Sequence, residues 1–460
     1  MKILLCNPVV NIKYSHSRKG MYPPLGLLSL ATYLEAKFPG RVEVRVIDGD
    51  IEVMDENTFG GADIVGFHAN SFNYGNCLVL AEKARKFAKK IIFGGPHATV
   101  LWKNIMKNRE FVDFVIVNEG EIPFSLLVGK LLGENDLKLQ DIPNLVYRDE
   151  KSDIGFIISD KSYKNLPSDM VSPSRKFVDL DKYINNYKKV YSDGPVHFQR
   201  PSSVYSSKGC LWRDQTGGCI FCARLEKGVV FRNIDDLWQE IGALKESYNI
   251  DSIWDISDDN LNSSEWFKDY ARKKPDNLSE IGFFIYTRVN RITEEIIPYF
   301  RMLNVNEVYL GFESGDEAIL KMMVKGITTD IALKAAKRLK SAGIYYFPSF
   351  VIGLPGESRS SLKNTFEFAK ILSDIGSIHR MSATILWPAP GSVAFNHLMN
   401  NAECRTLLEG QDDISMQDLE KLWIERFTDI DYATAQEFQN KISNVLLEST
   451  GAKSFGTRQG

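Results

Sequence analysis

Three of the six cysteines fall in one short window, where Cys210 is followed by Cys219 and Cys222. Thiolates bind iron–sulfur clusters and zinc, and the glycine-rich loop around these residues allows their sulfurs to converge. Structural zinc prefers four protein ligands, whereas three thiolates leave one position open, and His197 lies beyond an apolar segment. The spacing therefore favours an iron–sulfur cluster with one open iron over a zinc site or three unrelated free thiols.

The composition is that of an ordinary globular protein. The chain has 460 residues, of which 25% are charged, and a formal net charge of -3, which gives no reason to expect nucleic acid as a partner. No apolar run is long enough to cross a bilayer and the N-terminus lacks a small-residue cleavage site, so we expect a soluble, cytoplasmic protein. We interpret Cys6, Cys77 and Cys404 as buried small hydrophobes, because they lie on apolar patterns.

Strand and helix patterns alternate over the first 150 residues. Helices are predicted at 24–38 and 77–88. Buried strands are predicted at 2–8, 42–47, 63–68, 91–95 and 112–117. This order is typical of a doubly wound parallel sheet, in which ligands bind at the carboxyl ends of the strands.

The loops that follow three of these strands are rich in small and polar residues, at 68–71, 93–99 and 118–121. Small residues there would let a large planar or phosphorylated ligand approach the backbone. Tight turns that require glycine explain any one of these loops equally well.

A second alternating series begins at the cysteine loop. Its strands are predicted at 203–206, 252–257, 282–287, 307–312, 346–352 and 382–387. Its helices are predicted at 236–248, 294–303, 331–342 and 362–372. Six such units predict a partial or full barrel of parallel strands, and the cysteine loop follows the first strand, at the barrel mouth.

Polar or turn-forming groups also follow the later barrel strands. The groups are Asp258-Asp259-Asn260, Arg288 with Asn290, Glu313-Ser314-Gly315, Gly353–Glu357 and Pro388–Gly391. Carboxylates and an arginine on one rim could hold a ligand that carries an ammonium and a carboxylate, as the backbone of methionine does. A helix N-cap explains Asp259 and Glu317 equally well, whereas the fork of Arg288 suits a carboxylate.

The remaining segments complete a predicted division into 1–150, a linker at 151–200, a barrel at 201–390 and a helical cap at 391–460. The cap has helical patterns at 418–427 and 435–447 and an end that we expect to fray from 451. Its aromatic residues are more typical of a core than of a binding surface: Trp423, Phe427, Tyr432 and Phe438.

Taken together, the chain resembles the cobalamin-binding radical SAM enzymes, in which a B12-binding Rossmann-like domain precedes a radical S-adenosylmethionine (SAM) barrel. The motifs that carry the resemblance span residues 1 to about 395. In the first domain they are Pro23–Leu27, Phe93–Thr99 and Glu119–Glu121, and in the barrel Gly209-Cys210, Cys219–Cys222, Leu310–Gly315 and Gly353–Glu357.

The resemblance implies three cofactors: a [4Fe–4S] cluster on Cys210, Cys219 and Cys222, SAM on the open iron, and cobalamin. The residues implied for SAM are Phe221, Asp258, Asp259, Arg288, Gly311 and Glu313. The residues implied for cobalamin are Asn70, Ser71, Gly94, Gly95, His97, Glu119, Gly120 and Glu121.

Two features depart from the family pattern. The usual cluster motif is C-x3-C-x2-C, whereas eight residues, 211 to 218, separate Cys210 from Cys219 here. Trp212, Arg213 and Asp214 within that spacer could reach the cofactor or the substrate. The D-x-H-x-x-G signature that supplies a cobalt ligand is absent, so we expect His97 to pack or hydrogen-bond near the nucleotide tail instead.

The resemblance also implies an activity. One SAM would supply a 5′-deoxyadenosyl radical, and methylcobalamin would methylate an unactivated carbon or phosphorus centre of a small molecule or peptide. Members of the family also catalyse cyclisation, rearrangement or dehydration, and a B12 sensor or carrier with a vestigial barrel is a further alternative. We expect a monomer that receives electrons from a flavodoxin or ferredoxin and has no membrane or nucleic-acid partner.

Overall fold

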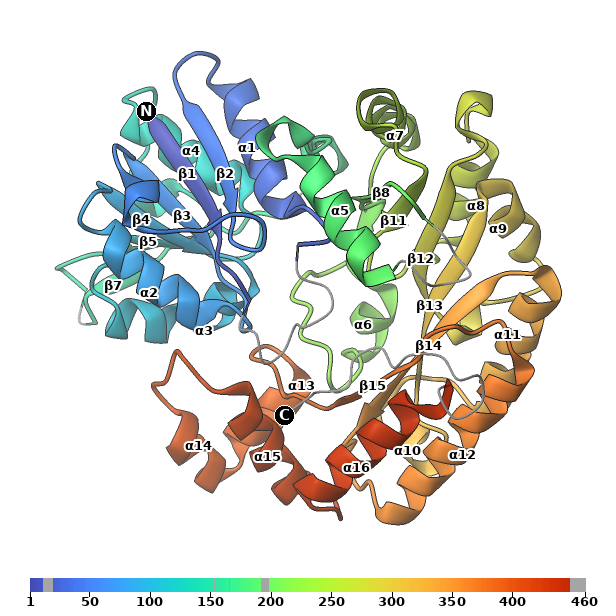
Figure 1. Ribbon diagram of the computed structural model, residues 1–460. Coiled ribbons are helices and arrows are strands. Elements are labelled where there is room, and N and C mark those ends of the chain that lie inside the picture. The colour runs from blue at the N-terminus through green and yellow to red at the C-terminus, as the bar shows by residue number, and fades with distance from the viewer. Residues whose placement is uncertain (11–19, 153, 165, 192–197, 447–460) are drawn as a thin grey trace. The chain divides into compact units, whose positions relative to one another are not determined.

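The computed structural model describes residues 1–10, 20–152, 154–164, 166–191 and 198–446 (Figure 1). His197 and the end that we expected to fray therefore lie outside the described residues. The chain forms two compact units, one of residues Met1–Tyr187 with Thr406–Ile414 and the other of Lys188–Arg405 with Ser415–Gly460.

The first unit is built on a seven-stranded sheet in the order β2-β1-β3-β4-β5-β6-β7. The strands are β1 (Lys2–Asn7), β2 (Glu43–Asp48), β3 (Ile64–His68), β4 (Lys90–Gly94), β5 (Phe114–Ile116), β6 (Leu145–Arg148) and β7 (Phe156–Ile158). β1 to β5 pair in parallel, and β6 and β7 add antiparallel to the β5 edge. The predicted doubly wound sheet is confirmed, and the order of its first five strands is the flavodoxin-like one.

The apolar runs form these strands because both faces of the sheet are covered, so consecutive side chains are buried. In β1, Ile3, Leu5 and Cys6 are each 2% exposed or less. The helices of this unit are α1 (Leu25–Lys37), α2 (Tyr74–Ala84), α3 (Pro96–Asn108), α4 (Glu121–Leu131) and α5 (Leu180–Tyr191). Cys77, on α2, is fully buried, as is Cys404 in the second unit, so the interpretation of both as buried hydrophobes is confirmed.

The segment that we predicted to be a linker, 151–200, contains regular structure. It supplies β7 and α5, and the buried residues of α5, Leu180, Tyr183, Ile184 and Tyr187, recur at helical spacing. The Tyr183 hydroxyl donates to Asp48 Oδ2 over 2.8 Å at the end of β2. These contacts explain why the chain up to Tyr187 packs with the first sheet.

The second unit is built on a six-stranded, all-parallel sheet in the order β15-β14-β13-β12-β11-β8. The strands are β8 (Pro201–Val204), β11 (Ser252–Asp255), β12 (Gly282–Arg288), β13 (Val305–Glu313), β14 (Tyr345–Ile352) and β15 (Ser382–Ile385). The helices between them are α7 (Ile234–Tyr248), α8 (Ser264–Arg272), α9 (Ile297–Leu303), α10 (Glu317–Met322), α11 (Thr329–Ala342) and α12 (Arg359–Ile375). The predicted partial barrel of six strand–helix units is confirmed, with its helices along one side of the curved sheet in Figure 1.

A short antiparallel ribbon of β9 (Ser207–Lys208) and β10 (Val230–Phe231) was not predicted. It closes the base of the loop that carries the three clustered cysteines. Each of its strands has only two residues, which is too short for an alternating pattern to reveal.

The C-terminal region is helical, as predicted, with α13 (Val393–Asn400), α14 (Ala402–Leu408), α15 (Met416–Phe427) and α16 (Tyr432–Ser443). α16 covers the edge strand β15, where Gln439 Nε2 donates to Ala383 O and Ala383 N donates to Ser443 Oγ. An edge strand that is covered in this way cannot pair with another chain. Trp423 and Phe438 are at most 2% exposed, consistent with their interpretation as core.

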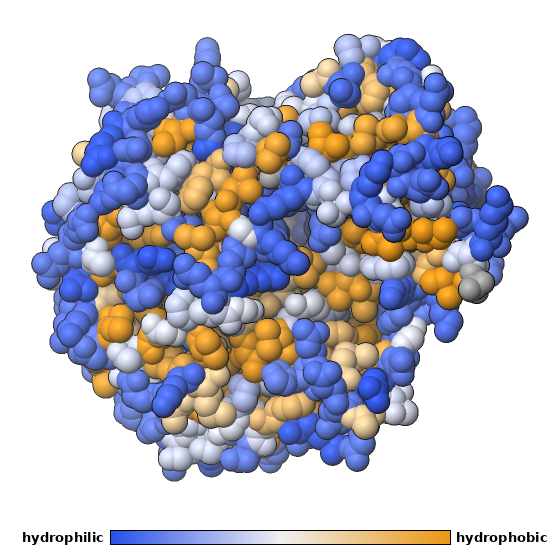
Figure 2. All heavy atoms as spheres, turned by 180° about the vertical axis from the view of Figure 1, so that it is seen from behind, coloured by the Kyte–Doolittle hydropathy of each residue, from blue (hydrophilic) through white to orange (hydrophobic). Residues whose placement is uncertain are grey.

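Polar and apolar residues are interspersed over the face shown in Figure 2. In the described part of the chain, no helix combines the length and the apolar character needed to cross a bilayer.

Candidate cofactor-binding sites

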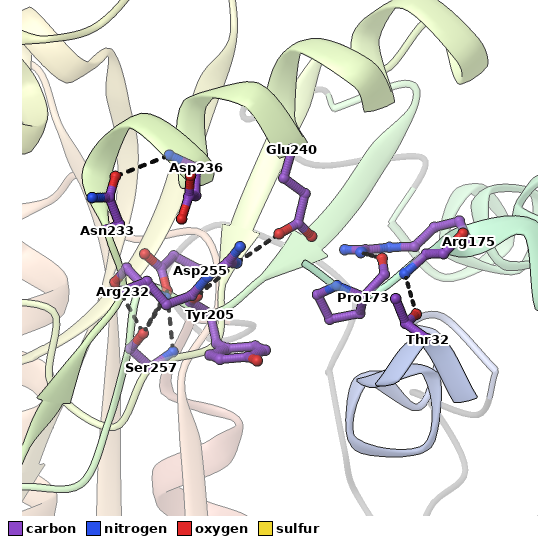
Figure 3. A network of polar contacts seen from close by, with 12 residues as sticks. Thr32, Pro173, Arg175, Tyr205, Arg232, Asn233, Asp236, Glu240, Asp255 and Ser257 are labelled. Carbon is purple, nitrogen blue, oxygen red and sulfur yellow. Dashed lines mark hydrogen bonds and ion pairs between the residues drawn. The ribbon is translucent and has the colours of Figure 1, made fainter. Parts of the chain in front are cut away.

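The chain that leads into the cysteine loop is anchored on the second barrel strand. The backbone N–H of Ser206 donates to Asp255 Oδ1 over 3.1 Å and to Ser257 Oγ over 2.9 Å, and Ser207 N donates to the same hydroxyl. Figure 3 shows Asp255 and Ser257 converging beside the Arg232–Glu240 ion pair, whose atoms are 2.6 Å apart. A buried carboxylate, Asp255, and a buried hydroxyl, Ser257, therefore fix where the loop begins.

A single side chain holds the backbone on both sides of Cys210. Asn262 donates from Nδ2 to Gly209 O over 2.9 Å and accepts from Leu211 N over 3.0 Å. Gly209 has a φ of 93°, and a Cβ there would lie 2.0 Å from Gly228 O, so no other residue fits without a shift of the backbone. Sequence reasoning missed Asn262, although the polar run that begins at Asp258 is a signal that could have included it.

The eight-residue spacer between Cys210 and Cys219 forms a short helix. It folds as α6 (Leu211–Thr216) and ends at Gly217 and Gly218, both with a positive φ. The chain then returns to Cys219, whose carbonyl accepts from Cys222 N over 2.9 Å. The long spacing is therefore used to build a helix, and it leaves Cys219 and Cys222 on one turn.

The three clustered thiols are free and partly exposed. Burial raises the pKa of Cys219 and of Cys222, and the ammonium of Lys325 opposes that rise at Cys219. Among the described residues no three His, Cys, Asp or Glu side chains converge on a single metal ion. A four-iron cluster takes each thiolate on a different iron, so three cysteines can hold such a cluster and leave its fourth iron open.

The spacer between Cys210 and Cys219 contacts the barrel through Trp212. Its Nε1–H donates to Val324 O over 2.9 Å, and the Arg288 guanidinium lies 4.2 Å from the centre of its ring. Arg288 also donates to Lys325 O and is 7% exposed. The predicted SAM residue Arg288 is thus at the end of its strand, as expected, with its guanidinium stacked on an aromatic ring.

Glu313 forms a buried ion pair with Lys325, and each residue is 5% exposed. Glu313 has a φ of 67°, which is a left-handed conformation that L side chains rarely adopt. A Cβ on Gly311 would lie 2.1 Å from Glu313 Oε1 and 2.3 Å from Lys325 Nζ, so this glycine makes room for the pair. Lys325 Nζ also lies 6.0 Å from the centre of the Phe221 ring. Sequence reasoning missed Lys325, which follows no strand directly.

The two predicted aspartates differ in what they contact. Asp258 is partly exposed and forms an ion pair with Arg224 over 2.9 Å. Asp259 is 2% exposed and accepts from Thr287 Oγ1 over 2.7 Å and from Leu261 N over 3.0 Å. Burial raises the pKa of both carboxyl groups. Asp258 is therefore the one with a partly accessible carboxylate, and Asp259 is committed to internal partners.

The loop after β14 is stabilised by hydrogen bonds from its backbone to the side chain of Glu357, which lies in the same loop. Glu357 accepts from the backbone N–H groups of Gly353 and Leu354 and is 0% exposed. Burial raises its pKa to about 8. Trp423 Nε1 donates to Gly353 O over 2.7 Å, so helix α15 holds this loop from the other side.

In the first unit the predicted cobalamin loops follow β3, β4 and β5, which are neighbours in the sheet. The loops after β3 and β4 approach through their backbones: Ala69 N donates to Gly94 O over 2.8 Å, and His97 N donates to Ala69 O over 3.1 Å. A Cβ on Gly95, whose φ is 95°, would lie 2.6 Å from Ala69 O. The contact with Ala69 therefore explains why Gly95 is a glycine, as the tight-turn alternative requires, and the role of these loops in binding a large planar ligand stays a prediction.

The polar residues of these two loops hold one another. Asn70 Oδ1 accepts from Phe72 N and Asn73 N, which is a turn motif of asparagine. Ser71 Oγ lies 2.8 Å from His97 Nδ1. His97 is 3% exposed, and its Nε2 lies 2.7 Å from the carbonyl oxygen of Asp412, a residue that sequence reasoning had no means of placing there.

The three predicted cobalamin residues in the loop after β5 differ in burial and in their contacts. Gly120 is the N-cap of α4. Glu121 is 5% exposed and accepts from Ser29 Oγ of α1 over 3.2 Å, so its carboxylate has a partner within the helical layer. Glu119 is partly exposed, and its carbonyl accepts from Asn144 over 3.4 Å.

Comparisons with known proteins match one family to each of the two units. The B12 binding domain family matches residues 13–128, and the Radical SAM superfamily matches residues 204–369. The chain is 28% identical to an uncharacterized methyltransferase of Pyrococcus horikoshii over 87% of this chain and 84% of that one. It is 25% identical to the cytidylyl-2-hydroxyethylphosphonate methyltransferase of Streptomyces wedmorensis over 80% of this chain and 77% of that one.

Its relatives also include the anaerobic magnesium-protoporphyrin IX monomethyl ester cyclase of Rubrivivax gelatinosus, at 22% identity over 76% of this chain and 62% of that one. The solved structure of the radical SAM methyltransferase TsrM from Kitasatospora setae, with cobalamin and a [4Fe–4S] cluster bound, has the same fold. It aligns with a TM-score of 0.69 at 17% identity and covers 86% of this chain and 78% of that one.

These findings define the protein as a radical SAM enzyme with an N-terminal B12-binding domain. The predicted set of cofactors, a [4Fe–4S] cluster, SAM and cobalamin, is confirmed at the level of these two domains. The individual binding residues stay predictions.

Proposed function

We propose that the enzyme transfers a methyl group to an unactivated carbon or phosphorus centre of a small molecule or peptide. The observation that carries the proposal is the similarity to a methyltransferase of Pyrococcus horikoshii that extends through both domains. When bound, the cluster and SAM supply a 5′-deoxyadenosyl radical, and cobalamin supplies a carrier for the methyl group.

The residues of the barrel mouth would have separate roles. Cys210, Cys219 and Cys222 hold the cluster, and the nearby ammonium of Lys325 favours the thiolate form of Cys219. Asp258, whose carboxylate is partly accessible, suits the ammonium group of SAM. Arg288 uses one of the five N–H donors of its guanidinium on Lys325 O, and the others suit a carboxylate.

The test is a product analysis. Anaerobic incubation of the reconstituted enzyme with SAM, cobalamin, a one-electron donor and candidate substrates should yield both S-adenosylhomocysteine and 5′-deoxyadenosine. Formation of 5′-deoxyadenosine alone would contradict methyl transfer. That outcome would favour a cyclisation, rearrangement or dehydration, the alternative that the cyclase relative supports.

A matched pair of cysteine variants tests whether the barrel is catalytic. Cys210→Ala should lose the cluster absorbance and all 5′-deoxyadenosine formation, because one of the three thiolates is gone. Cys404→Ala, at a fully buried thiol on α14, should keep both. A B12 sensor or carrier would keep its function in the Cys210 variant, which would overturn the enzymatic proposal.

The proposal includes an electron donor of the flavodoxin or ferredoxin type and a monomeric state. Sedimentation of the purified protein and reduction of its cluster by either donor would test these two points.

A further inference from the structure

A short piece of the C-terminal region packs with the N-terminal unit. We call residues Thr406–Ile414, which belong to that unit, the docking segment. Its backbone carbonyls accept from two side-chain amides of α3: Asn104 Nδ2 donates to Gln411 O over 2.6 Å and Asn108 Nδ2 donates to Gly410 O over 2.8 Å. The segment therefore lies along the helix that begins in the predicted cobalamin loop.

The centre of the docking segment is Asp412, which is 2% exposed. Its carboxylate accepts from the Tyr74 hydroxyl over 2.6 Å, from Arg109 Nε over 2.7 Å and from Asn108 Nδ2 over 2.8 Å. Burial alone would raise the pKa of Asp412, but the hydrogen bonds from Arg109, Asn108 and Tyr74 outweigh it and lower that pKa. The carboxylate is thus ionised and fixed by three donors.

The backbone carbonyl of the same residue fixes the tautomer of His97. Since a carbonyl oxygen only accepts, the His97 Nε2 that lies 2.7 Å from Asp412 O carries the hydrogen. Burial lowers the pKa of His97 to about 4, so the ring is neutral at neutral pH and its Nδ1 is an acceptor. The ring is also stacked on Tyr74, with 4.1 Å between the ring centres.

The tautomer of His97 determines the direction of its hydrogen bond with Ser71. Its hydroxyl, 2.8 Å from His97 Nδ1, must be the donor in that bond. A hydroxyl has one hydrogen, so Ser71 Oγ keeps only lone pairs for any further partner. A ligand group at Ser71 must therefore bring its own N–H or O–H, whereas a phosphate oxygen, which needs a donor, does not match.

We propose that Asp412 is a positioning residue for the cobalamin site. It holds His97 as the neutral Nε2–H tautomer, and His97 in turn holds Ser71 Oγ as an acceptor for an amide N–H on the edge of the corrin ring. This inference rests on the proposed assignment of the loops after β3 and β4 to cobalamin, and it adds the chemical class of the group that meets Ser71.

The test is equilibrium binding of hydroxocobalamin to the full-length protein, followed by absorbance. Asp412→Ala keeps the backbone carbonyl but removes the side-chain bonds that fix its position, so binding should weaken about 5- to 10-fold as the contact with His97 loosens. Asp413→Ala, at the exposed neighbour in the same segment, is the matched control and should bind as the wild type does. Asp412→Asn replaces Asp412→Ala if the latter fails to fold.

A double-mutant cycle separates positioning from general destabilisation. If Asp412 acts through Ser71, the Ser71→Ala/Asp412→Ala protein should bind no more weakly than Ser71→Ala alone. Additive losses, or unchanged binding by Asp412→Ala, would overturn the inference. A wild type that binds no hydroxocobalamin would instead overturn the cofactor assignment on which it rests.

Cobinamide, which keeps the amide-bearing corrin but lacks the nucleotide tail, identifies the group at Ser71. The loss caused by Ser71→Ala should be equal with hydroxocobalamin and with cobinamide. A loss seen only with hydroxocobalamin would assign Ser71 to the tail and overturn the amide part of the proposal.

Discussion

The two predicted cofactor sites hold their residues in different ways. At the barrel mouth, charged side chains are paired with one another, as in Lys325 with Glu313 and Arg224 with Asp258. In the loops after β3 and β4, the partners are backbone groups and neutral side chains, such as Ser71 with His97.

The difference matches the ligands that we propose. SAM carries an ammonium, a carboxylate and a sulfonium, so a site for it needs charged side chains, and in the protein these are paired with one another. The corrin edge carries neutral amides, for which fixed donors and acceptors are sufficient. The two sites should therefore respond differently to loss of a charge, loss of an aromatic contact and a change of pH.

The largest effect should come from breaking the buried ion pair. Lys325→Met leaves Glu313 buried without its cation, and we expect the free energy of unfolding to fall by about 3 kcal/mol in urea denaturation. Adding Glu313→Gln should restore part of that loss, because no uncompensated charge remains. Lys334→Met, at an exposed pair with Asp330, is the control and should change stability by less than about 0.5 kcal/mol. An equal loss in both single variants would contradict the comparison.

A smaller effect should follow from Trp212→Ala. This variant removes the stack on Arg288 and the bond to Val324 O, contacts worth about 1–2 kcal/mol together. We expect about 5- to 10-fold weaker SAM binding in isothermal titration, with cobalamin binding unchanged. Trp212→Phe should be intermediate. Trp102→Ala, at a half-buried tryptophan of the first unit, should leave SAM binding as it is, and a similar loss there would argue against a specific role for Trp212.

A third effect should be a pair of pH dependences of opposite sign. The folded pKa of Glu357, about 8, lies above its ordinary 4.5, so its contribution is complete below pH 4.5 and is lost as the pH rises through about 8. The folded pKa of His97, about 4, lies below its ordinary 6.5, so its contribution is complete above pH 6.5 and is lost as the pH falls toward 4.

Hydrogen exchange in each unit measures these dependences separately. Glu357→Gln should flatten the loss of barrel protection between pH 4.5 and 8, and His97→Gln should flatten the loss in the first unit between pH 6.5 and 4. A slope that is unchanged in either variant would assign the effect to other groups.

Local pattern was enough to predict most of the fold. The apolar runs at Lys2–Asn7 and Tyr345–Ile352 form strands because both faces of each sheet are buried. A strand that is buried on both faces has apolar residues in succession, which is a pattern visible in the sequence. The helical repeat of Leu180, Tyr183, Ile184 and Tyr187 also indicates a helix. The segment that contains it is nevertheless predicted to be a linker, because turn residues precede the repeat.

The site was predictable only in part. The cysteines and the strand-end residues are local in sequence, so their spacing identified them. The partners that fix them are remote: Val324 lies 112 residues from Trp212, and Asp412 lies 315 residues from His97. Such pairs follow from how the elements pack, which single-sequence periodicity does not encode.

The docking segment has a consequence for how the protein is made. During synthesis, residues 1–187 emerge from the ribosome first. The docking segment, Thr406–Ile414, which completes their unit, emerges only after the barrel strands have been synthesised. Until then, His97 lacks the carbonyl that it contacts in the finished protein, and Tyr74 and Arg109 lack their carboxylate. A fragment that stops at residue 187 is therefore an incomplete domain, whereas one that carries residues 406–414 on a tether would contain every contact of the docking segment described above.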